Sequence, residues 1–472
     1  MATNRVRVCA RKLTQFHDRF ASGFGRKEAR GHSLVYLRGL LLGQGRKNVE
    51  RIALRFTTAS HGGPTGQSEV VALQEFLTAS PWDHHNVQQN VQAVFAEELV
   101  PSCSKWSIGT VGVVDESAFV KSGPESCGTK RQWCGRLGKK ENCQVGVFLV
   151  GVAPAGTALL DHQLYLPQEW TTDRARRKKT RVPKNITFQT KPQMATDQIR
   201  RVRANGHVGF DWITADELYG RNGDFLDALE ADGQRYVVEV PVNTVVWTED
   251  PATQNRSWCG NGRPPKNPCR DSVRNVKDVA KSLPADAWQT LQLREGAKGP
   301  LAFQFTAVRV WAMRHKKPGP PIWLNISRSL EKTPEIKYYV SNADEQTPLE
   351  PMALVTGTRW RVEELFEDGK GDFGMADYEA RAWTSWHHHM SLVAMAHLFM
   401  TTTRQELQEE MPELTLPLAL ELITATLSRP TLSETDALHL TEYHLHRNRV
   451  ARQSHRKSWI RKHKHVKPRP LL

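Results

Sequence analysis

Three charged residues in the last third of the chain have a spacing that could support phosphoryl chemistry. Arg359, Glu363 and Lys370 follow one another at separations of four and seven residues. Because an α-helix turns once in about 3.6 residues, side chains at these separations lie near one face of a helix. A carboxylate on that face can bind a divalent cation while the flanking cations contact phosphate oxygens. The spacing therefore predicts a helix that carries a metal-ligating acid.

Two further acids stand where predicted strands end. Asp115 closes the run Ile108-Gly-Thr-Val-Gly-Val-Val, and Asp216 closes Trp212-Ile-Thr-Ala. Both runs contain β-branched residues, which favour extended structure. An aspartate at a strand end often caps the following turn or helix, so that interpretation stays open for each acid taken alone. The presence of Glu363 on the predicted helix favours a site that this residue shares with Asp115 and Asp216.

The elements that must position these acids follow an α/β pattern. Apolar and β-branched runs predict further strands at residues 144–152, 157–165 and 236–240, and helical patterns cover residues 192–204 and 222–231. This order of strands and helices indicates one mixed sheet. A stretch rich in Pro, Gly and Trp, with short strands, follows at residues 241–350 and indicates a β-rich insertion.

The charges on the predicted helix resemble a known signature. Bacterial insertion-sequence DDE transposases carry Tyr-x2-Arg-x3-Glu-x6-Lys in their final catalytic helix, and Arg359, Glu363 and Lys370 fit its last three positions. Thr356 stands at the tyrosine position, so this chain departs from the signature there. Further segments similar to the same family are Lys130–Val145, Leu164–Trp170 and Tyr338–Ala343, and the resemblance extends over roughly residues 30–400.

The resemblance implies a ribonuclease-H-like core, in which a β-rich insertion interrupts the mixed sheet. It also implies that Asp115, Asp216 and Glu363 are the catalytic residues and the metal ligands. Three carboxylates can hold two Mg²⁺ ions about 3.5–4 Å apart, with Mn²⁺ as a substitute. In that arrangement Asp115 contacts both ions, while Asp216 and Glu363 each complete one side. The implied reaction cuts transposon ends at their terminal inverted repeats and joins them to target DNA, with a homodimer acting on paired ends.

The chain divides into five predicted regions. They are a helical DNA-end-binding region at 1–100, the first part of the catalytic core at 101–240, the β-rich insertion at 241–350, the last part of the core with the third acid at 351–400, and a helical C-terminal region with a basic tail at 401–472.

The charge balance points to a polyanionic partner. Lys and Arg number 65 against 50 Asp and Glu, which leaves a net charge of +15. Residues 174–181 hold six cations and predict a phosphate-binding loop, with a solvated loop as the alternative. Residues 447–469 hold ten cations and no acid, which predicts a disordered polyanion-binding tail, or otherwise a solubility tail. The residues expected to contact DNA are Arg359, Lys370, Lys130, Arg131, Arg174, Arg176, Arg177, Lys178 and Lys179.

Several protein classes fit the sequence less well. No apolar segment follows the start, and the longest apolar stretch, residues 145–160, contains glycines and Pro154, so neither a signal peptide nor a membrane span is expected. The seven cysteines include no CxxC pair, which argues against a disulfide framework and a structural zinc site. We expect a bacterial cytoplasmic, nucleoid-associated protein. A domesticated DNA-binding protein of the same fold and a structure-specific nuclease remain alternatives.

Overall fold

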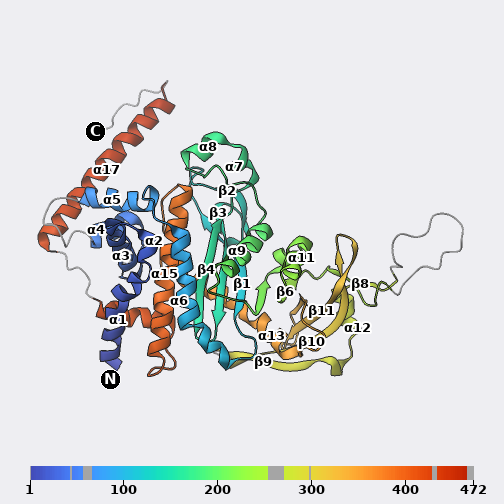
Figure 1. Cartoon of the computed structure of the whole chain (residues 1–472). Helices are drawn as coiled ribbons and strands as arrows, with labels where there is room; N and C mark the ends of the chain where they lie inside the picture. Colours follow the sequence, from blue (N-terminus) through green and yellow to red (C-terminus); the bar gives the residue numbers. More distant parts are fainter. Residues whose placement is uncertain are drawn as a thin grey trace.

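A mixed sheet with helices packed around it forms the body of the protein (Figure 1). The structure, a computed structural model, describes residues 2–42, 45–56, 66–252, 271–296, 299–427 and 433–464. Within these residues the sheet has 12 strands, in the order β2-β3-β1-β5-β6-β12-β11-β10-β7-β8, and β4 and β9 pair with β3 and β10. This arrangement confirms the predicted mixed α/β class and is consistent with a ribonuclease-H-like core.

Five of the six strands of the core lie near the residues where the sequence predicts strands, and β2 was not predicted. The six strands are β1 (Val111–Val120), β2 (Lys130–Cys134), β3 (Lys139–Ala153), β4 (Gly156–Leu164), β5 (Trp212–Ala215) and β6 (Tyr236–Val240). β1 runs antiparallel to β3 and parallel to β5, and β5 runs parallel to β6. One expectation is wrong, because Asp115 lies in the middle of β1 and not at its end. β1 continues to Val120 because β3 pairs with it over its whole length.

The strands of the predicted insertion extend the same sheet. They and their helix are β7 (Val245–Trp247), β8 (Val273–Asn275), α12 (Val276–Ser282), β9 (Gln289–Gly296), β10 (Gly299–Arg314), β11 (Lys317–Ser329) and β12 (Ile336–Ser341). β12 pairs with β6 of the core, and the long hairpin of β10 and β11 follows on its outer side. The insertion is therefore joined to the core through backbone hydrogen bonds.

Helices precede the sheet, as the sequence predicts. They are α1 (Ala2–Asp18), α2 (Ala21–Phe24), α3 (Lys27–Leu42), α4 (Val49–Phe56), α5 (Gly66–Thr78) and α6 (His84–Glu98). The start of α6 is fixed by Asp83, whose carboxylate accepts a hydrogen bond from the His85 amide at 2.9 Å and caps the helix. The glycine-rich segment at 61–66 lies largely outside the described residues.

The remaining helices pack around the sheet or follow it. They are α7 (Gln168–Thr172), α8 (Arg174–Lys179), α9 (Lys191–Asn205), α10 (Glu217–Gly220), α11 (Gly223–Ala231), α13 (Leu349–Thr358), α14 (Trp360–Gly371), α15 (Trp383–Leu407), α16 (Leu416–Thr426) and α17 (Glu434–Lys462). α15 packs against β4 on one side and against several N-terminal helices on the other. Among the described residues, no helix combines the length and apolarity that a membrane span requires.

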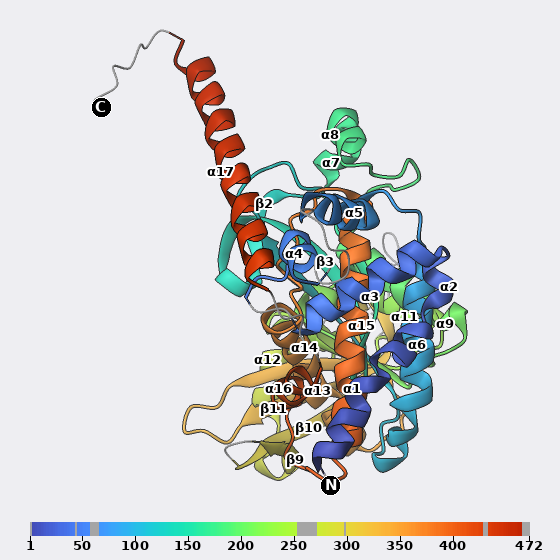
Figure 2. The ribbon, with the colours of Figure 1, turned by 90° about the vertical axis from the view of Figure 1, so that its left-hand side faces the viewer.

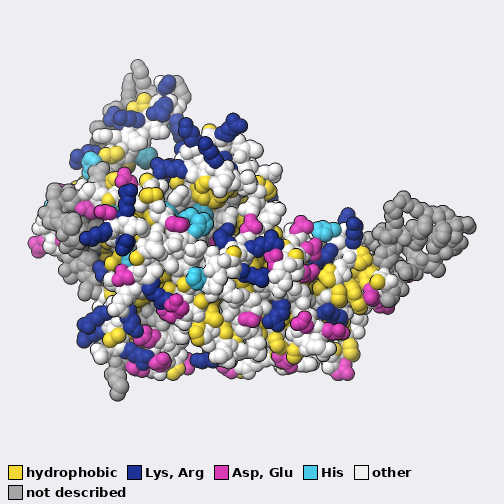
Figure 3. Space-filling model, viewed as in Figure 1, with side chains coloured by type: hydrophobic (Ala, Val, Ile, Leu, Met, Phe, Trp, Pro, Cys, Tyr) yellow, Lys and Arg dark blue, Asp and Glu magenta, His cyan; other side chains and the backbone are white. Residues whose placement is uncertain are grey.

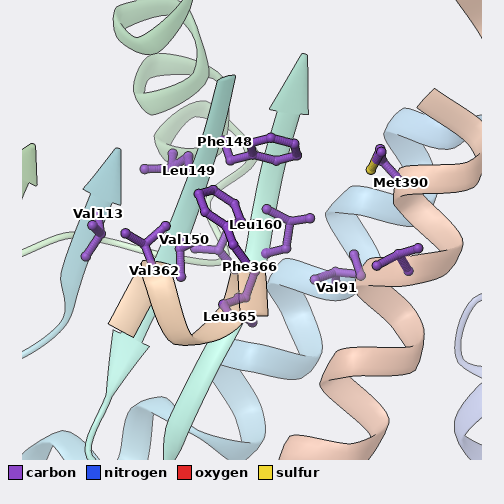
Figure 4. Packing of buried hydrophobic residues seen from close by; sticks show 14 of the residues in the cluster. Val91, Val113, Phe148, Leu149, Val150, Leu160, Val362, Leu365, Phe366 and Met390 are labelled. Carbon is purple, nitrogen blue, oxygen red and sulfur yellow. The ribbon is translucent and has the colours of Figure 1, made fainter. Parts of the chain in front are cut away.

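The apolar face of α14 fixes the helix that carries the predicted third acid. Val362, Leu365 and Phe366 are buried at separations of three and four residues and point toward the sheet (Figure 4). The Phe366 ring lies 5.1 Å from that of Phe148 on β3. Because Glu363 follows Val362 by one residue, it turns away from this packed face.

The C-terminal basic segment is helical, which corrects the expectation of disorder. α17 continues through Lys462 and projects away from the body of the molecule (Figures 1 and 2). Its start is fixed by a capping box, in which Ser433 and Asp436 exchange hydrogen bonds. The Tyr443 hydroxyl donates to Glu50 on α4 at 3.0 Å, and Arg447 pairs with the same carboxylate at 3.2 Å. Residues 465–472 of the predicted tail lie outside the described residues.

Candidate active site

The register of two parallel strands brings Asp115 and Asp216 together. The last paired residues of β1 and β5 are Val114 and Ala215, and each aspartate is the next residue of its chain segment. Asp216 also caps α10, because its carboxylate accepts a hydrogen bond from the Leu218 amide at 2.8 Å. The capping interpretation is therefore right for Asp216, which caps α10 and also lies beside Asp115.

The three predicted acids line one pocket. Asp115, Asp216 and Glu363 all face a space of about 840 Å³ between the sheet and α14. The remaining charged residues that line the pocket are the acids Glu116 and Glu367 and the cations Arg136, Lys191 and Lys370. The pocket thus combines carboxylates that could bind cations with cations that could contact phosphates.

Asp115 is a largely buried carboxyl whose pKa is raised. Its side chain is 14% exposed. Burial raises the pKa of this carboxyl to about 7, with a further contribution from Asp216, while the nearby Arg359 opposes the rise. Negative charge is therefore costly at this position unless a cation neutralises it.

The donor set fits a divalent cation in chemistry and in charge. Mg²⁺ and Mn²⁺ prefer carboxylate oxygens, which Asp115, Asp216 and Glu363 provide. Among the described residues, however, no group of three or more His, Cys, Asp or Glu side chains already lies close enough to hold an ion. Glu363 is the exposed member of the set, since its side chain is 61% exposed.

Arg359 connects two of these acids to a carboxylate from another strand. Its guanidinium lies 3.5 Å from Asp115 Oδ2, 3.1 Å from Glu363 Oε1 and 3.6 Å from Glu239 Oε2. Its side chain is 22% exposed. The sequence predicts that Arg359 contacts DNA, yet in this structure its guanidinium faces carboxylates. Thr356, at the signature's tyrosine position, donates a hydrogen bond to Ala353 within α13 at 2.7 Å.

Lys370 lies in the pocket, whereas Lys130 and Arg131 lie on the neighbouring strand β2. The Lys370 ammonium is 5.6 Å from the centre of the Phe119 ring, and burial and the nearby Arg136 lower its pKa. Lys130 forms an ion pair with Glu169 at 2.7 Å. Arg131 is exposed. Lys370 is therefore the predicted DNA contact that shares the pocket with the acids.

The cations of residues 174–179 form a short helix, α8, and not the predicted loop. Asp173 caps this helix by accepting a hydrogen bond from the Arg176 amide at 2.9 Å. Arg176 stacks over Trp170 at 3.6 Å, Arg177 donates to the carbonyl of Pro183 at 2.8 Å, and Lys179 pairs with Glu125. The side chains of Arg174 and Lys178 are exposed. Figure 3 shows Lys and Arg side chains gathered over this part of the molecule.

Sequence reasoning missed several residues of the pocket. Glu116 follows Asp115 and accepts a hydrogen bond from Lys191 at 2.6 Å and from the Tyr219 hydroxyl at 3.2 Å. Trp133 lines the pocket beside Arg136 although its side chain is 59% exposed. Trp133 and Arg136 belong to the segment that resembles the transposase family, which was the available signal; nothing local marked Lys191.

The histidine run at residues 387–389 has a structural role. Each ring is buried and hydrogen-bonds to a backbone carbonyl, of Trp383, Leu77 and Gly374 respectively. Burial lowers the pKa of His387 to about 3 and of His388 to about 4, so both are neutral near pH 7. These rings pack α15 against its neighbours.

Asp115 on β1, Asp216 directly after the parallel strand β5, and Glu363 on a helix packed over the sheet thus line one pocket of an α/β protein. The chain matches the family described as DDE superfamily endonuclease over residues 19–300, and it belongs to that family. This match includes Asp115 and Asp216 and ends before Glu363. Enzymes of this superfamily generally use divalent metal ions.

A curated relative points in the same direction. The chain is 30% identical over 175 residues to a protein of Microchaete diplosiphon described as "Probable transposase for insertion sequence element IS701". The aligned part covers 37% of this chain and 41% of that relative, so the chain spans less than half of the relative's length.

Proposed function

We propose that this protein is a DNA transposase of a bacterial insertion sequence. It would cut transposon ends and join them to target DNA. The observation that carries the proposal is the single pocket lined by Asp115, Asp216 and Glu363, with Arg136, Lys191 and Lys370 beside them. Membership of the DDE endonuclease family and similarity to the IS701 protein support the same function.

Asp115, Asp216 and Glu363 would hold Mg²⁺, or Mn²⁺ in its place. Bound there, the metal would activate the attacking hydroxyl and stabilise the leaving oxygen of the phosphodiester. Asp115 and Asp216 supply fixed carboxylates from the sheet, and Glu363 supplies one from α14. Lys370 would neutralise the non-bridging oxygens of the scissile phosphate, because its ammonium lies in the same pocket.

Double-stranded DNA would be held by cations outside the pocket. Arg174 and Lys178 on α8 and Arg131 on β2 are exposed. Arg176, Arg177, Lys179 and Lys130 already make contacts within the protein, so DNA would have to share or displace these partners. The basic part of α17 would contact phosphates of any sequence.

The N-terminal helices would recognise the transposon ends. Lys27, Arg30 and Arg38 on α3 are exposed and could reach DNA, whereas Lys47 is buried. α1, α3, α5 and α6 pack against α15, so these helices are integral to the fold. Recognition is therefore best tested by substituting the exposed cations in the full chain. Loss of preference for end sequences over random DNA is the expected result.

We further propose a homodimer on paired ends and residence in the bacterial cytoplasm with the nucleoid. The two transposon ends require coordinated cutting, which one pocket per chain supplies in a dimer. The five regions predicted from the sequence, with boundaries at residues 100, 240, 350 and 400, are also proposed for this protein.

One assay separates the proposed function from its rivals. Full-length protein is incubated with Mg²⁺, a labelled transposon end and a supercoiled target plasmid. A transposase yields both cut ends and joined products, whereas a structure-specific nuclease yields cut DNA alone. A domesticated DNA-binding protein yields neither product, although it binds the end. Joined products that require Mg²⁺ are the expected result, and their absence in the presence of cutting would contradict the proposal.

A further inference from the structure

A fourth carboxylate, Glu239, lies next to the proposed metal ligands without facing the pocket. Glu239 is on β6, the strand beside β5, and is 8% exposed. It is not among the residues that line the pocket, whereas Asp115, Asp216 and Glu363 are. Its Oε2 atom lies 3.6 Å from Arg359 Nε, and its Oε1 atom lies 3.5 Å from Lys337 Nζ. Glu239 therefore contacts the site through Arg359.

Arg359 lies at the junction of α13 and α14 and uses different nitrogens for its different partners. Nη1 faces Asp115, Nη2 faces Glu363 and Nε faces Glu239. A guanidinium can do this because its donors are fixed in a planar fork. One positive charge thus lies among carboxylates from two strands and one helix.

This arrangement conflicts with metal binding at the same carboxylates. Asp115 and Glu363 each direct one carboxylate oxygen toward the Arg359 guanidinium, which partly neutralises their charge. Among the described residues, no three acids lie close enough together to hold an ion. A divalent cation bound by Asp115 and Glu363 would therefore compete with Arg359 for these carboxylates, whereas Glu239 contacts the arginine without lining the pocket.

We propose that Glu239 and Arg359 form an internal counter-ion pair that sets the affinity of the site for divalent metal. In the arrangement described above, Arg359 supplies positive charge to Asp115 and Glu363. When the acids bind metal, Arg359 retains its contact with Glu239 and leaves the other two carboxylates. Glu239 is thus a positioning residue that acts through Arg359. The inference rests on the proposed metal-dependent function of the pocket.

A double-mutant cycle on the full chain tests this role, with Mn²⁺ binding as the readout. Arg359→Gln removes the competitor, so Mn²⁺ is expected to bind at least about fivefold more tightly, the lower range for coupled sites. Glu239→Gln removes the anchor and drives Arg359 onto Asp115 and Glu363, so Mn²⁺ is expected to bind about fivefold more weakly. In the Arg359→Gln background, Glu239→Gln is expected to have no further effect.

The cycle distinguishes positioning from simple charge effects. If Glu239 acted only through its distant negative charge, its substitution would weaken Mn²⁺ binding equally in both backgrounds, and that additive result would overturn the inference. Arg361→Gln is the matched control, because Arg361 lies on the same helix and pairs with Glu364 at 4.0 Å. It should leave Mn²⁺ affinity unchanged, and circular dichroism would verify that each variant is folded.

The same titrations separate failure of the inference from failure of the proposed function. Asp115→Ala should abolish Mn²⁺ binding if the pocket is the metal site. If the parent bound no Mn²⁺, or if Asp115→Ala bound it normally, the metal-dependent function would be wrong, and the inference would fall with it. If Asp115→Ala failed to bind Mn²⁺ while the cycle was additive, only the role of Glu239 would be wrong.

Discussion

The two strand-borne acids and the helix-borne acid are held in place by different means. Asp115 and Asp216 follow paired residues of adjacent parallel strands, so backbone hydrogen bonds fix their positions. Glu363 depends on the packing of α14 against the sheet and on its contact with Arg359 at 3.1 Å. Its side chain is 61% exposed, compared with 14% for Asp115. The sheet thus supplies a rigid half of the site, and α14 supplies an adjustable half.

The largest expected effect comes from removing the rigid half. Asp115→Ala and Asp216→Ala should each lower Mg²⁺-dependent cleavage by about a thousandfold or more, since a metal ion supplies several kcal/mol of transition-state stabilisation. Binding of transposon-end DNA should persist because the cations that bind it are unchanged. Gel-shift and cleavage assays on the same preparations measure both quantities. Substantial cleavage by either variant would contradict the assignment of the sheet as the source of two ligands.

Loosening the adjustable half should cost both stability and activity. Leu365 is 3% exposed on the packed face of α14, so Leu365→Ala is expected to destabilise the protein by about 2–5 kcal/mol. Cleavage at a temperature where the variant is folded should also fall, because the position of Glu363 depends on this packing. Leu40→Ala on α3, at a residue that is 0% exposed, is the control for stability alone. Equal activity in the two variants would show that packing of α14 does not tune the site.

The buried charge of Asp115 predicts a pH dependence of the metal-free protein. Burial raises its pKa from the ordinary value of 3.8 to about 7, so the folded state binds more protons than the unfolded state between these values. The contribution of Asp115 to folding stability should therefore decrease as pH rises from about 4 to about 7. Thermal unfolding in EDTA should show a smaller loss across this range for Asp115→Asn than for the parent. Identical pH profiles would mean that this carboxyl is not strained.

The smallest expected effect concerns the projecting basic helix. Truncation after residue 446 removes the cations of α17 and its continuation, which act on phosphates and not on bases. Affinity for all DNA sequences should fall by a similar factor, and the slope of log K against log salt should become shallower by about 0.9 for each phosphate that the protein no longer neutralises. Titrations at several salt concentrations measure this slope. An unchanged slope would leave α17 without a role in DNA binding.

The strands next to Asp115 and Asp216 were largely predictable from local sequence, whereas the grouping of these acids in one site came from the resemblance to the transposase family. Runs of Val and Ile marked β1, β3 and β6, and Asn222 marked the start of α11. The extension of β1 past Asp115 was not predictable, because it depends on pairing with β3, a strand distant in the sequence. The contact of Arg359 with Glu239 could not be predicted from local sequence for the same reason, since it joins residues more than a hundred positions apart.

Two basic segments show how local signals were overlooked. Their density of charge suggested a loop and a disordered tail, yet residues 174–179 and the tail through Lys462 are helical. Asp173 precedes the first segment, and the Ser433 and Asp436 pair precedes the second, and each provides a helix cap that the sequence displays. Capping residues were therefore more informative than charge density.

The central claim is that Glu363 completes the site, and side-by-side cleavage by four variants tests it most directly. Glu363 and Glu367 line the pocket, whereas Glu364 faces Arg361, and Glu379 accepts a hydrogen bond from Asn48 at 3.0 Å. Mg²⁺-dependent cleavage should be lost in Glu363→Ala and should remain measurable in Glu364→Ala, Glu367→Ala and Glu379→Ala. Robust cleavage by Glu363→Ala, with Glu367→Ala or Glu379→Ala inactive instead, would contradict the account.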